Sequence, residues 1–301
     1  MVDITHKSNT LRKAVATAVV EVSLKSTIDA IQERKVPKGD VFEFARVAGF
    51  FGIKNTSSVI PDCHPLPVEF SAITYEVIDL SVIINVEVHT IYKTGVEVEA
   101  MYGASVAALV MYDMLKPIDK NVQIKNIRLL EKTGGKSDNK KDFSHLKAAV
   151  VVCSDSVSKG EKQDTAGKTI VSELEKNKIS CVNYEIIPDD FDLIQKTAIA
   201  IKDKGIDLII FTGGTGLSSR DVTPDAILPL IDRSIPGIME AARDYGQNRI
   251  KTAMLSRSIA GFMGNTLILT FPGSQKASQE YMYAIFPQVL HIFDIKNGEG
   301  H

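Results

Sequence analysis

Short, nearly continuous apolar runs alternate with helical stretches in the second half of the chain. The runs are Ala148–Cys153, Val182–Ile187, Ile206–Phe211 and Leu267–Phe271. Helices are expected over Thr165–Lys176, over Phe191–Lys204 with Gly205 closing it, and from the last run to about Phe293. Strands that are apolar on both faces and separated by helices are typical of a parallel sheet covered on both sides. This half is therefore predicted to form a three-layer α/β domain with a mostly parallel sheet.

The first half of the chain follows a different pattern. Two segments alternate apolar with polar residues and are rich in β-branched side chains, which favours strands, and Asp79 between them suggests a hairpin. Asp40 is placed to cap a helix. The expected strands are Val68–Val77, Ser81–Tyr92 and Val122–Leu130, and the expected helices are Lys38–Phe50 and Ala104–Leu115. This mixture predicts an α+β domain.

A polar stretch, Lys132–Ser144, separates the two halves with the sequence KTGGKSDNKKDFS. Such composition is typical of a linker, because charged runs are usually solvated, although a phosphate-contacting arm is the alternative. A length of 301 residues is ample for two domains. We expect a domain over residues 1–136, a linker over 137–145 and a second domain over 146–301.

The net charge of −2 argues against a nucleic-acid binder, which usually carries a basic excess. No apolar run approaches the roughly 20 residues that span a bilayer, and the polar N-terminus has no signal-peptide core. The three cysteines, Cys63, Cys153 and Cys181, are widely spaced and form no CxxC pair. We therefore expect a cytoplasmic protein without nucleic-acid or membrane partners.

In the first half, Asp113 falls on the apolar face of the helix expected over Ala104–Leu115, with Lys116 one turn away. A carboxylate in that position is either presented into a pocket or a subunit interface, or held in a structural ion pair with Lys116.

Glu97 and Glu99 would share one side of an extended segment, which Val96 and Val98 favour. Neighbouring carboxylates raise each other's pKa, and a raised pKa suits acid–base chemistry. The alternative is that the two glutamates lie on an exposed strand edge with their charges pointing outward. His64 is held between Cys63 and a proline, and by itself indicates no function. Lys54 is equally uninformative alone.

Taken together, these segments resemble the MoaC-type cyclic pyranopterin monophosphate synthases of molybdenum-cofactor biosynthesis. The resemblance covers roughly Met1–Lys136 and runs through MVDIT, KGDVFEFARVAG, IKNT, IPDCHPL, KTGVEVEAM, ASVAALVMYDMLK and RLLEKTGGKS. It implies a lyase that converts 3′,8-cyclo-7,8-dihydroguanosine triphosphate to cyclic pyranopterin monophosphate and pyrophosphate. It also implies a ferredoxin-like α+β fold, assembled as a hexamer with sites at a dimer interface.

The resemblance assigns roles to particular positions. Lys54 and Lys116 match the family's catalytic lysines, and Asp113 matches their acidic partner. The other matching pocket residues are Cys63, His64, Glu97 and Glu99. Asp62 stands where the family pattern usually has leucine, and an extra carboxylate beside His64 could raise its pKa or displace it.

In the second half, each segment of unusual composition directly follows an expected strand. These segments are Ser154-Asp155-Ser156, Pro188-Asp189-Asp190, Thr212-Gly213-Gly214-Thr215-Gly216 and Pro272-Gly273-Ser274. Open α/β sheets bind ligands outside the carboxyl ends of their strands. Each glycine-rich turn alone could be a plain connection, but their common position predicts a binding site.

The Thr212–Gly216 loop lets the backbone approach a ligand and present N–H groups to anions. It is neither a Walker A loop nor a dinucleotide fingerprint, because the required spacings are absent. Thr223-Pro224 is expected to start a helix with Thr223 as its cap, and Ser274 is expected to cap another.

The downstream segments resemble the MogA/MoaB family, whose fold the gephyrin G domain shares. The matching segments are VVVCSDSVSKGEKQDTAGK, IIPDD, IIFTGGTGLSSRDVTPDAI, LSRSIAG and LTFPGSQKA, within about Leu146–Ile295. The resemblance implies adenylylation of molybdopterin with MgATP as the nucleotide substrate. Asp189 and Asp221 match carboxylates tied to catalysis and Mg²⁺; Asp155 and Asp164 are secondary candidates.

The resemblance further implies that Thr212–Gly216 and Pro272–Ser274 line the nucleotide and pterin phosphates. Gln275 stands where the family often has proline. An alternative keeps the upstream lyase but makes the downstream half a pterin-binding or oligomerisation module without adenylyl transfer. Either way we expect small-molecule substrates and a homo-oligomer, a hexamer or a trimer.

Overall fold

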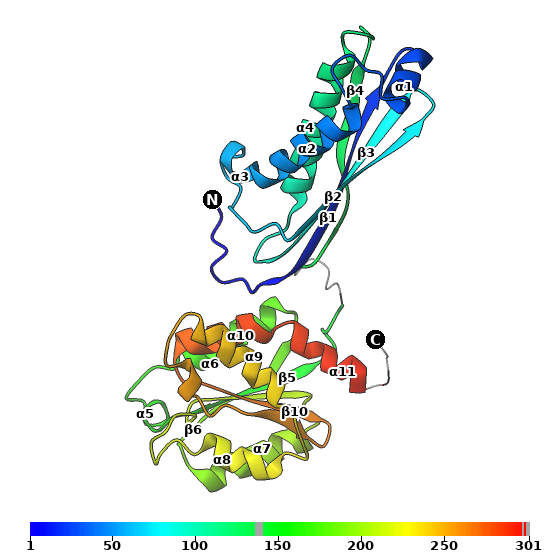
Figure 1. Cartoon of the computed structure of the whole chain (residues 1–301). Helices are drawn as coiled ribbons and strands as arrows, with labels where there is room; N and C mark the ends of the chain where they lie inside the picture. The colour runs from blue at the N-terminus through cyan, green and yellow to red at the C-terminus, as the bar shows by residue number, and fades with distance from the viewer. Residues whose placement is uncertain (136–140, 297, 299–301) are drawn as a thin grey trace. The chain divides into compact units, whose positions relative to one another are not determined.

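The computed structural model describes residues 1–135, 141–296 and 298, and it divides the chain into two compact units (Figure 1). The N-unit is Met1–Lys140 and the C-unit is Lys141–His301. Residues 136–140, which include part of the predicted linker, lie outside the described residues. The two ends of the polar stretch are structured: Lys132 and Thr133 belong to a strand, and Phe143 is buried in the C-unit core.

The N-unit has one antiparallel sheet in the order β2-β3-β1-β4. Its strands are β1 (Thr10–Glu21), β2 (Phe70–Ile78), β3 (Ser81–Tyr92) and β4 (Gln123–Thr133). Its helices are α1 (Lys25–Gln32), α2 (Val41–Lys54), α3 (Thr56–Val59) and α4 (Glu97–Leu115). The α+β prediction and the hairpin at Asp79, whose φ is 53°, are confirmed.

Alternate residues of the central strands face the helices and make the N-unit core. Ala14, Ala16 and Ala18 of β1 are fully buried, and so are Val82, Ile84, Val86 and Val88 of β3. Helices α2 and α4 lie together on one face of the sheet (Figure 1). Gly103 allows their close approach, because a Cβ there would lie 2.5 Å from Ile53 Cγ1. The helix α2 begins at the Asp40 cap, as predicted.

Several features of the N-unit differ from the sequence analysis, including the helices α1 and α3, which were not predicted. The strand β1 was not predicted, since three of its five buried residues are small alanines. The extended segment predicted at Glu97 and Glu99 is wrong, because α4 begins at Glu97 and runs seven residues further upstream than expected. Glu97 and Glu99 therefore point in different directions, and only Glu99 is buried.

The C-unit has one sheet in the order β6-β5-β7-β10-β9-β8, in which β6, β5, β7 and β10 are parallel. Its strands are β5 (Lys147–Cys153), β6 (Ser180–Ile187), β7 (Leu208–Thr212), β8 (Arg233–Ser234), β9 (Ala260–Met263) and β10 (Thr266–Phe271). Its α-helices are α5 (Asp155–Ser158), α6 (Ala166–Lys176), α7 (Phe191–Asp203), α8 (Thr223–Ile227), α9 (Pro236–Gln247), α10 (Gln275–Ile285) and α11 (His291–Lys296). Short 3₁₀ turns occupy Leu228–Leu230, Ala253–Leu255 and Gln288–Leu290.

Helices cover both faces of this sheet, as predicted. One core packs α6, α9, α10 and α11 against it, and the other packs α7 and α8 (Figure 1). Gly205 follows α7 with φ 73°, as expected of a helix C′ residue. The single long helix predicted up to Phe293 is wrong: the chain leaves α10 before Pro287 and resumes at His291, because proline cannot continue a helix.

One helix among the described residues, α4, meets the length and composition of a membrane span, with 19 residues and a mean hydropathy of 1.2. Half of that window is buried inside the protein. Its burial against the N-unit sheet explains its apolar composition as that of a core helix.

Candidate functional site

At the carboxyl end of α4, Asp113 is held between two lysines. Its Oδ1 lies 2.7 Å from Lys116 Nζ, and its Oδ2 lies 2.6 Å from Lys38 Nζ, which also donates to the Asp113 carbonyl. These hydrogen bonds, that of Lys116 first, lower the pKa of Asp113 to about 2. The ion pair with Lys116 considered above is present. Lys38 was missed, because only the packing of α2 on α4 brings it to this carboxylate.

Lys54 lies away from this cluster within one chain. It is the last residue of α2, next to Ile53, which contacts Gly103. Lys38, just before α2, reaches Asp113 at the other end of α4, so the two helices run antiparallel. At 1.5 Å per residue, Gly103 and Asp113 are about 15 Å apart along α4. A single N-unit therefore does not bring Lys54 together with Asp113 and Lys116.

Near the start of α4, Cys63 donates a hydrogen bond to Glu99 Oε1 at 3.2 Å. Glu99 is 2% exposed, and its Oε2 has no partner among the described residues. Burial raises the pKa of Glu99, and burial together with Glu99 raises the pKa of the Cys63 thiol to about 11. His64 follows, half-buried, while Asp62 pairs with the Met1 amino group at 2.6 Å.

A cavity of about 290 Å³ opens in the N-unit at Glu97, the first residue of α4. Its lining includes Lys7, Arg12, Lys13, Lys93, Thr94, Gly95, Glu97, Lys132, Thr133, Gly134 and Gly135. Glu97 pairs with Lys132 at 3.3 Å, and Arg12 Nη1 donates to the Gly134 carbonyl at 2.7 Å. Its charged lining is thus five cations and one carboxylate, which suits a polyanion such as a triphosphate. Of the predicted residues only Glu97 lines it.

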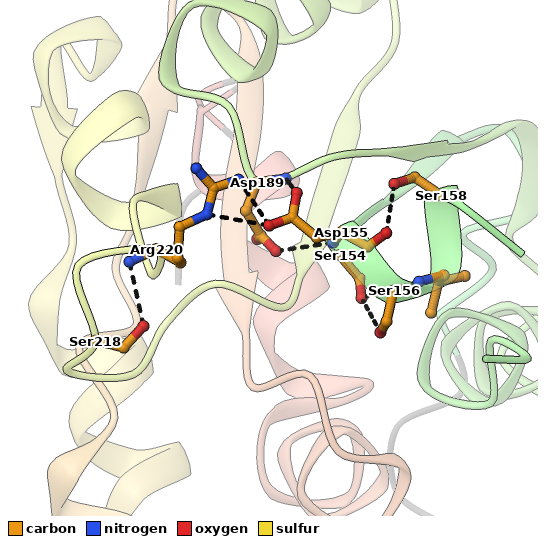
Figure 2. A network of polar contacts seen from close by, with 8 residues as sticks. Ser154, Asp155, Ser156, Ser158, Asp189, Ser218 and Arg220 are labelled. Atoms are coloured by element: carbon orange, nitrogen blue, oxygen red, sulfur yellow. Dashed lines mark hydrogen bonds and ion pairs between the residues drawn. The ribbon is translucent and has the colours of Figure 1, made fainter. Parts of the chain in front are cut away.

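In the C-unit, the loops after β5 and β6 are joined by two reciprocal bonds (Figure 2). The backbone N–H of Asp155 donates to Asp189 Oδ2 at 3.0 Å, and that of Asp189 donates to Asp155 Oδ1 at 3.2 Å. Arg220 donates to Asp155 Oδ2 from Nη2 at 2.6 Å and from Nε at 3.0 Å. The guanidinium of Arg220 holds the pKa of Asp155 below its ordinary value. Both oxygens of Asp155 are thereby hydrogen-bonded, whereas Oδ1 of Asp189 is buried without a partner among the described residues.

The glycine-rich loop crosses the end of β5 in a conformation that needs glycine. Gly213 has φ 100° and Gly214 has φ 61°, and a Cβ on Gly213 would lie 2.1 Å from the Cys153 carbonyl oxygen. A Cβ on Gly214 would lie 2.4 Å from Thr223 Oγ1 and 2.8 Å from Asp189 Oδ1. The prediction that Thr223 caps α8 is wrong: Val222 is the cap residue, and the Thr223 hydroxyl turns toward Gly214 instead.

The carboxylates of Asp189 and Asp221 flank this loop. Asp189 Oδ1 is buried without a hydrogen-bond partner among the described residues, and burial raises its pKa. Asp221 Oδ2 accepts a hydrogen bond from the Ser218 N–H at 2.8 Å. It lies close to Gly216, because a Cβ added to that glycine would be 2.8 Å from this oxygen. Mg²⁺ prefers oxygen ligands and often takes one or two carboxylates together with phosphates. Within the described residues no group of three or more His, Cys, Asp or Glu could hold a metal ion by itself.

The remaining predicted residues connect these loops. Thr212 is fully buried and donates to the Pro272 carbonyl at 2.8 Å. A Cβ on Gly273 would lie 3.0 Å from Gly213 Cα, and Ser274 caps α10, as expected. Thr215 is also buried. Asp164 lies apart: it accepts the first amides of α6 and the Tyr184 hydroxyl, which is a structural arrangement.

Comparison with known proteins matches the two halves of the chain to two different family models. Residues 1–135 match the model of the MoaC family. Residues 149–291 match the model described as a probable molybdopterin binding domain. The match to a crystal structure of the molybdopterin biosynthesis enzyme MoaB from Thermus thermophilus has 38% identity and a TM-score of 0.49, and covers 51% of this chain and 97% of that one.

Two similar proteins extend over both units. A molybdenum cofactor biosynthesis bifunctional protein of Chlorobaculum tepidum is 38% identical over 100% of this chain and 96% of its own length. Another from Synechococcus elongatus is 34% identical over 100% of this chain and 98% of its own. A cyclic pyranopterin monophosphate synthase of Nitratidesulfovibrio vulgaris is 45% identical over 46% of this chain. The chain belongs to the family of bifunctional molybdenum cofactor biosynthesis proteins, with a MoaC domain followed by a MogA/MoaB-like domain.

Proposed function

We propose that the N-unit converts 3′,8-cyclo-7,8-dihydroguanosine triphosphate to cyclic pyranopterin monophosphate and pyrophosphate. The observation that supports this most is the basic cavity at Arg12, Lys93 and Lys132, which offers cations for a triphosphate close to the Glu97 end of α4. The succession βαββαβ and the order β2-β3-β1-β4 support a ferredoxin-like fold for this unit.

Lys54, Lys116 and Asp113 act in this reaction together only if a second copy brings them together. Lys54 lies at the opposite end of the α2–α4 pair from Asp113, about 15 Å along the helix axis. Both helices expose apolar side chains that a partner copy would cover, namely Phe44, Val47, Phe51 and Leu109. A homo-oligomer, hexamer or trimer, with the active site shared between copies therefore accounts for the otherwise separate residues.

Within that site the residues divide the work by charge. Lys38 and Lys116 keep Asp113 ionised, and Asp113 in turn fixes both ammonium groups for contact with the anionic substrate. Glu99 is buried, and burial raises its pKa, which suits a group that exchanges a proton with the substrate. The Cys63 thiol holds one of its oxygens, and the half-buried His64 follows Cys63 in the chain.

We propose that the C-unit transfers AMP from MgATP to molybdopterin. A terminal phosphate oxygen of the pterin attacks the α-phosphorus, the α–β bridging bond breaks, and pyrophosphate leaves. The supporting observation is the buried, unpartnered Asp189 Oδ1 beside Gly214, with Asp221 on the other side of the loop. When bound, Mg²⁺ would neutralise phosphate charge between these carboxylates. The loops Thr212–Gly216 and Pro272–Ser274 present backbone N–H groups to the phosphates.

The second candidate keeps the lyase and makes the C-unit a pterin-binding or oligomerisation module without adenylyl transfer. The intact arrangement of Asp189, Asp221 and Gly214 favours transfer. The two proposed products are not consecutive, because sulfur must be inserted between them. We further propose that the protein acts in the cytoplasm on small molecules, without nucleic-acid or membrane partners.

The test is to incubate the purified chain with each substrate in turn. With the cyclised GTP derivative, cyclic pyranopterin monophosphate and pyrophosphate should form without ATP. With molybdopterin, pyrophosphate release should require both ATP and Mg²⁺, and mass spectrometry should detect adenylyl-molybdopterin. Pterin binding without pyrophosphate release would support the second candidate.

A further inference from the structure

Arg257 contacts three segments around the glycine-rich loop. Its Nε donates to the Gly216 carbonyl at 2.8 Å, and its Nη2 donates to the Asp221 carbonyl. Its Nη1 lies 2.9 and 2.8 Å from the two carboxylate oxygens of Asp225. The backbone N–H of Arg257 donates to the Thr215 carbonyl at 3.0 Å. One residue thus joins both ends of the exposed 217–220 segment to the start of α8.

The segment that bears Arg257 is itself well anchored. The next residue, Ser258, is buried, and its carbonyl accepts from Arg243 Nη1 at 2.9 Å. The N–H of Ile259 then donates to Thr270 Oγ1 at 2.7 Å, just before β9 begins. The guanidinium is therefore presented from a fixed backbone, and its Nε and Nη2 bind the two carbonyls while only Nη1 pairs with Asp225.

The contacts of Arg257 set the place of the Asp221 carboxylate. All four residues from Leu217 to Arg220 are exposed, and the ion pair of Arg220 with Asp155 holds the segment from its outer side. The two carbonyls that Arg257 binds are those of Gly216 and Asp221, which begin and end this path. By binding both carbonyls, Arg257 brings the two ends of the segment together, and Asp221 Oδ2 then lies against Gly216. A Cβ added to Gly216 would lie only 2.8 Å from that oxygen.

We propose that Arg257 is a positioning residue for Asp221, which holds that carboxylate against the glycine-rich loop at the place where a nucleotide-bound divalent cation is ligated. The inference rests on the proposed adenylyl transfer. Arg257 itself touches neither nucleotide nor pterin in this assignment, because all of its polar atoms are directed to the protein.

The experiment compares Arg257→Gln and Arg257→Lys with two controls. Asp225→Asn removes the ion pair but leaves both carbonyl contacts of Arg257. Arg243→Gln removes another arginine–carbonyl bond to the same segment without touching the glycine-rich loop. Lysine keeps the charge of Arg257 but lacks the planar guanidinium that donates to the Gly216 and Asp221 carbonyls at the same time. Arg257→Lys also provides a second variant if Arg257→Gln does not fold.

Three quantities are measured for each full-length variant. We expect Arg257→Gln to lower kcat of adenylyl transfer about 100-fold, as displaced catalytic groups do, with a smaller change in KM for molybdopterin. Mn²⁺, the metal probe, should bind the variant with ATP more weakly. Amide hydrogen exchange should be faster at Ser218 and Asp221, whose mutual bonds close the loop, but unchanged in β7. Both controls should match the wild type.

Unchanged kcat, Mn²⁺ affinity and exchange in both Arg257 variants would overturn the inference. Equal losses in the Arg243 control would also overturn it, since the effect would then come from general loosening of the segment. If the wild type shows no adenylyl transfer, the proposed function fails, yet loop exchange and Mn²⁺ affinity still decide whether Arg257 positions Asp221.

Discussion

Asp155 and Asp189 each accept the other's backbone N–H through a carboxylate oxygen, at 3.0 and 3.2 Å. These two hydrogen bonds connect the end of β5 to the end of β6, and each uses one carboxylate oxygen (Figure 2). Arg220 binds the second oxygen of Asp155, while Asp189 Oδ1 stays buried without a partner among the described residues. Two carboxylates of similar sequence context are therefore separated into a structural one and one that is available for a ligand.

Asp221→Asn should abolish adenylyl transfer while pterin binding survives. Asparagine keeps the shape of the side chain and its bond from Ser218 N–H but loses the charge that a metal requires. Kinetics, molybdopterin titration and melting temperature are measured together, with Asp190→Asn as a control at a carboxylate that caps α7 instead. Wild-type turnover and Mg²⁺ dependence would make Asp221 structural, and lost turnover with a lowered melting temperature would indicate a broken loop.

Lys54→Ala and Lys116→Ala should each abolish pyranopterin formation and leave the C-unit activity intact. The two lysines lie at opposite ends of the α2–α4 pair, so we expect mixed oligomers of the two variants to regain part of the activity through sites that draw one intact lysine from each copy. Coexpression followed by a product assay tests this. Mixed oligomers with no regained activity would place both lysines in a single-copy site. Lys116→Arg should not rescue a proton-transfer role, since guanidinium does not deprotonate at working pH.

Glu99→Gln should make the N-unit more stable at neutral pH. Burial raises the pKa of Glu99 in the folded protein, so the folded state binds more protons than the unfolded state. Stability then falls as pH rises from the unfolded pKa through the raised folded pKa, and glutamine removes that loss. Urea unfolding at acid and neutral pH should show a gain only at neutral pH. A gain of equal size at both would assign the effect to packing.

Gly103→Ala should destabilise the N-unit by about 1–3 kcal/mol through overpacking. A Cβ there would lie 2.5 Å from Ile53 Cγ1, at the contact between α2 and α4. Gly237→Ala is the matched helical control, because a Cβ at Gly237 would meet nothing within 4 Å, and it should be neutral or stabilising by up to about 1 kcal/mol. Calorimetry measures the change in unfolding free energy of both variants and tests this difference. Equal shifts would show that helix propensity, not packing, sets the result.

Local patterns determined much of this protein. The alternation of β3 over Ser81–Tyr92, the caps at Asp40 and Ser274, and the helix end at Gly205 depend on residues near in sequence, so they were predictable. The succession of apolar strands and helices predicted the parallel sheet, and parallel strands necessarily bring their following loops to one edge. Most candidate residues of the C-unit were found in this way, whereas Asp221 and Asp164 came from the family resemblance.

The tertiary structure alone decided which charges from distant parts of the chain meet. Lys38 reaches Asp113, and Arg257 reaches Gly216 and Asp221, across separations that no local period encodes. The burial of Glu99 also depends on tertiary packing. Val96 and Val98 favour a strand locally, but α4 packs in the same core as β1, and the helix therefore extends upstream to Glu97. The sequence by itself determined the elements and the edge at which they present their loops. Packing decided which carboxylates are neutralised and which one keeps an open oxygen, because desolvation and pairing depend on neighbours that only the fold supplies.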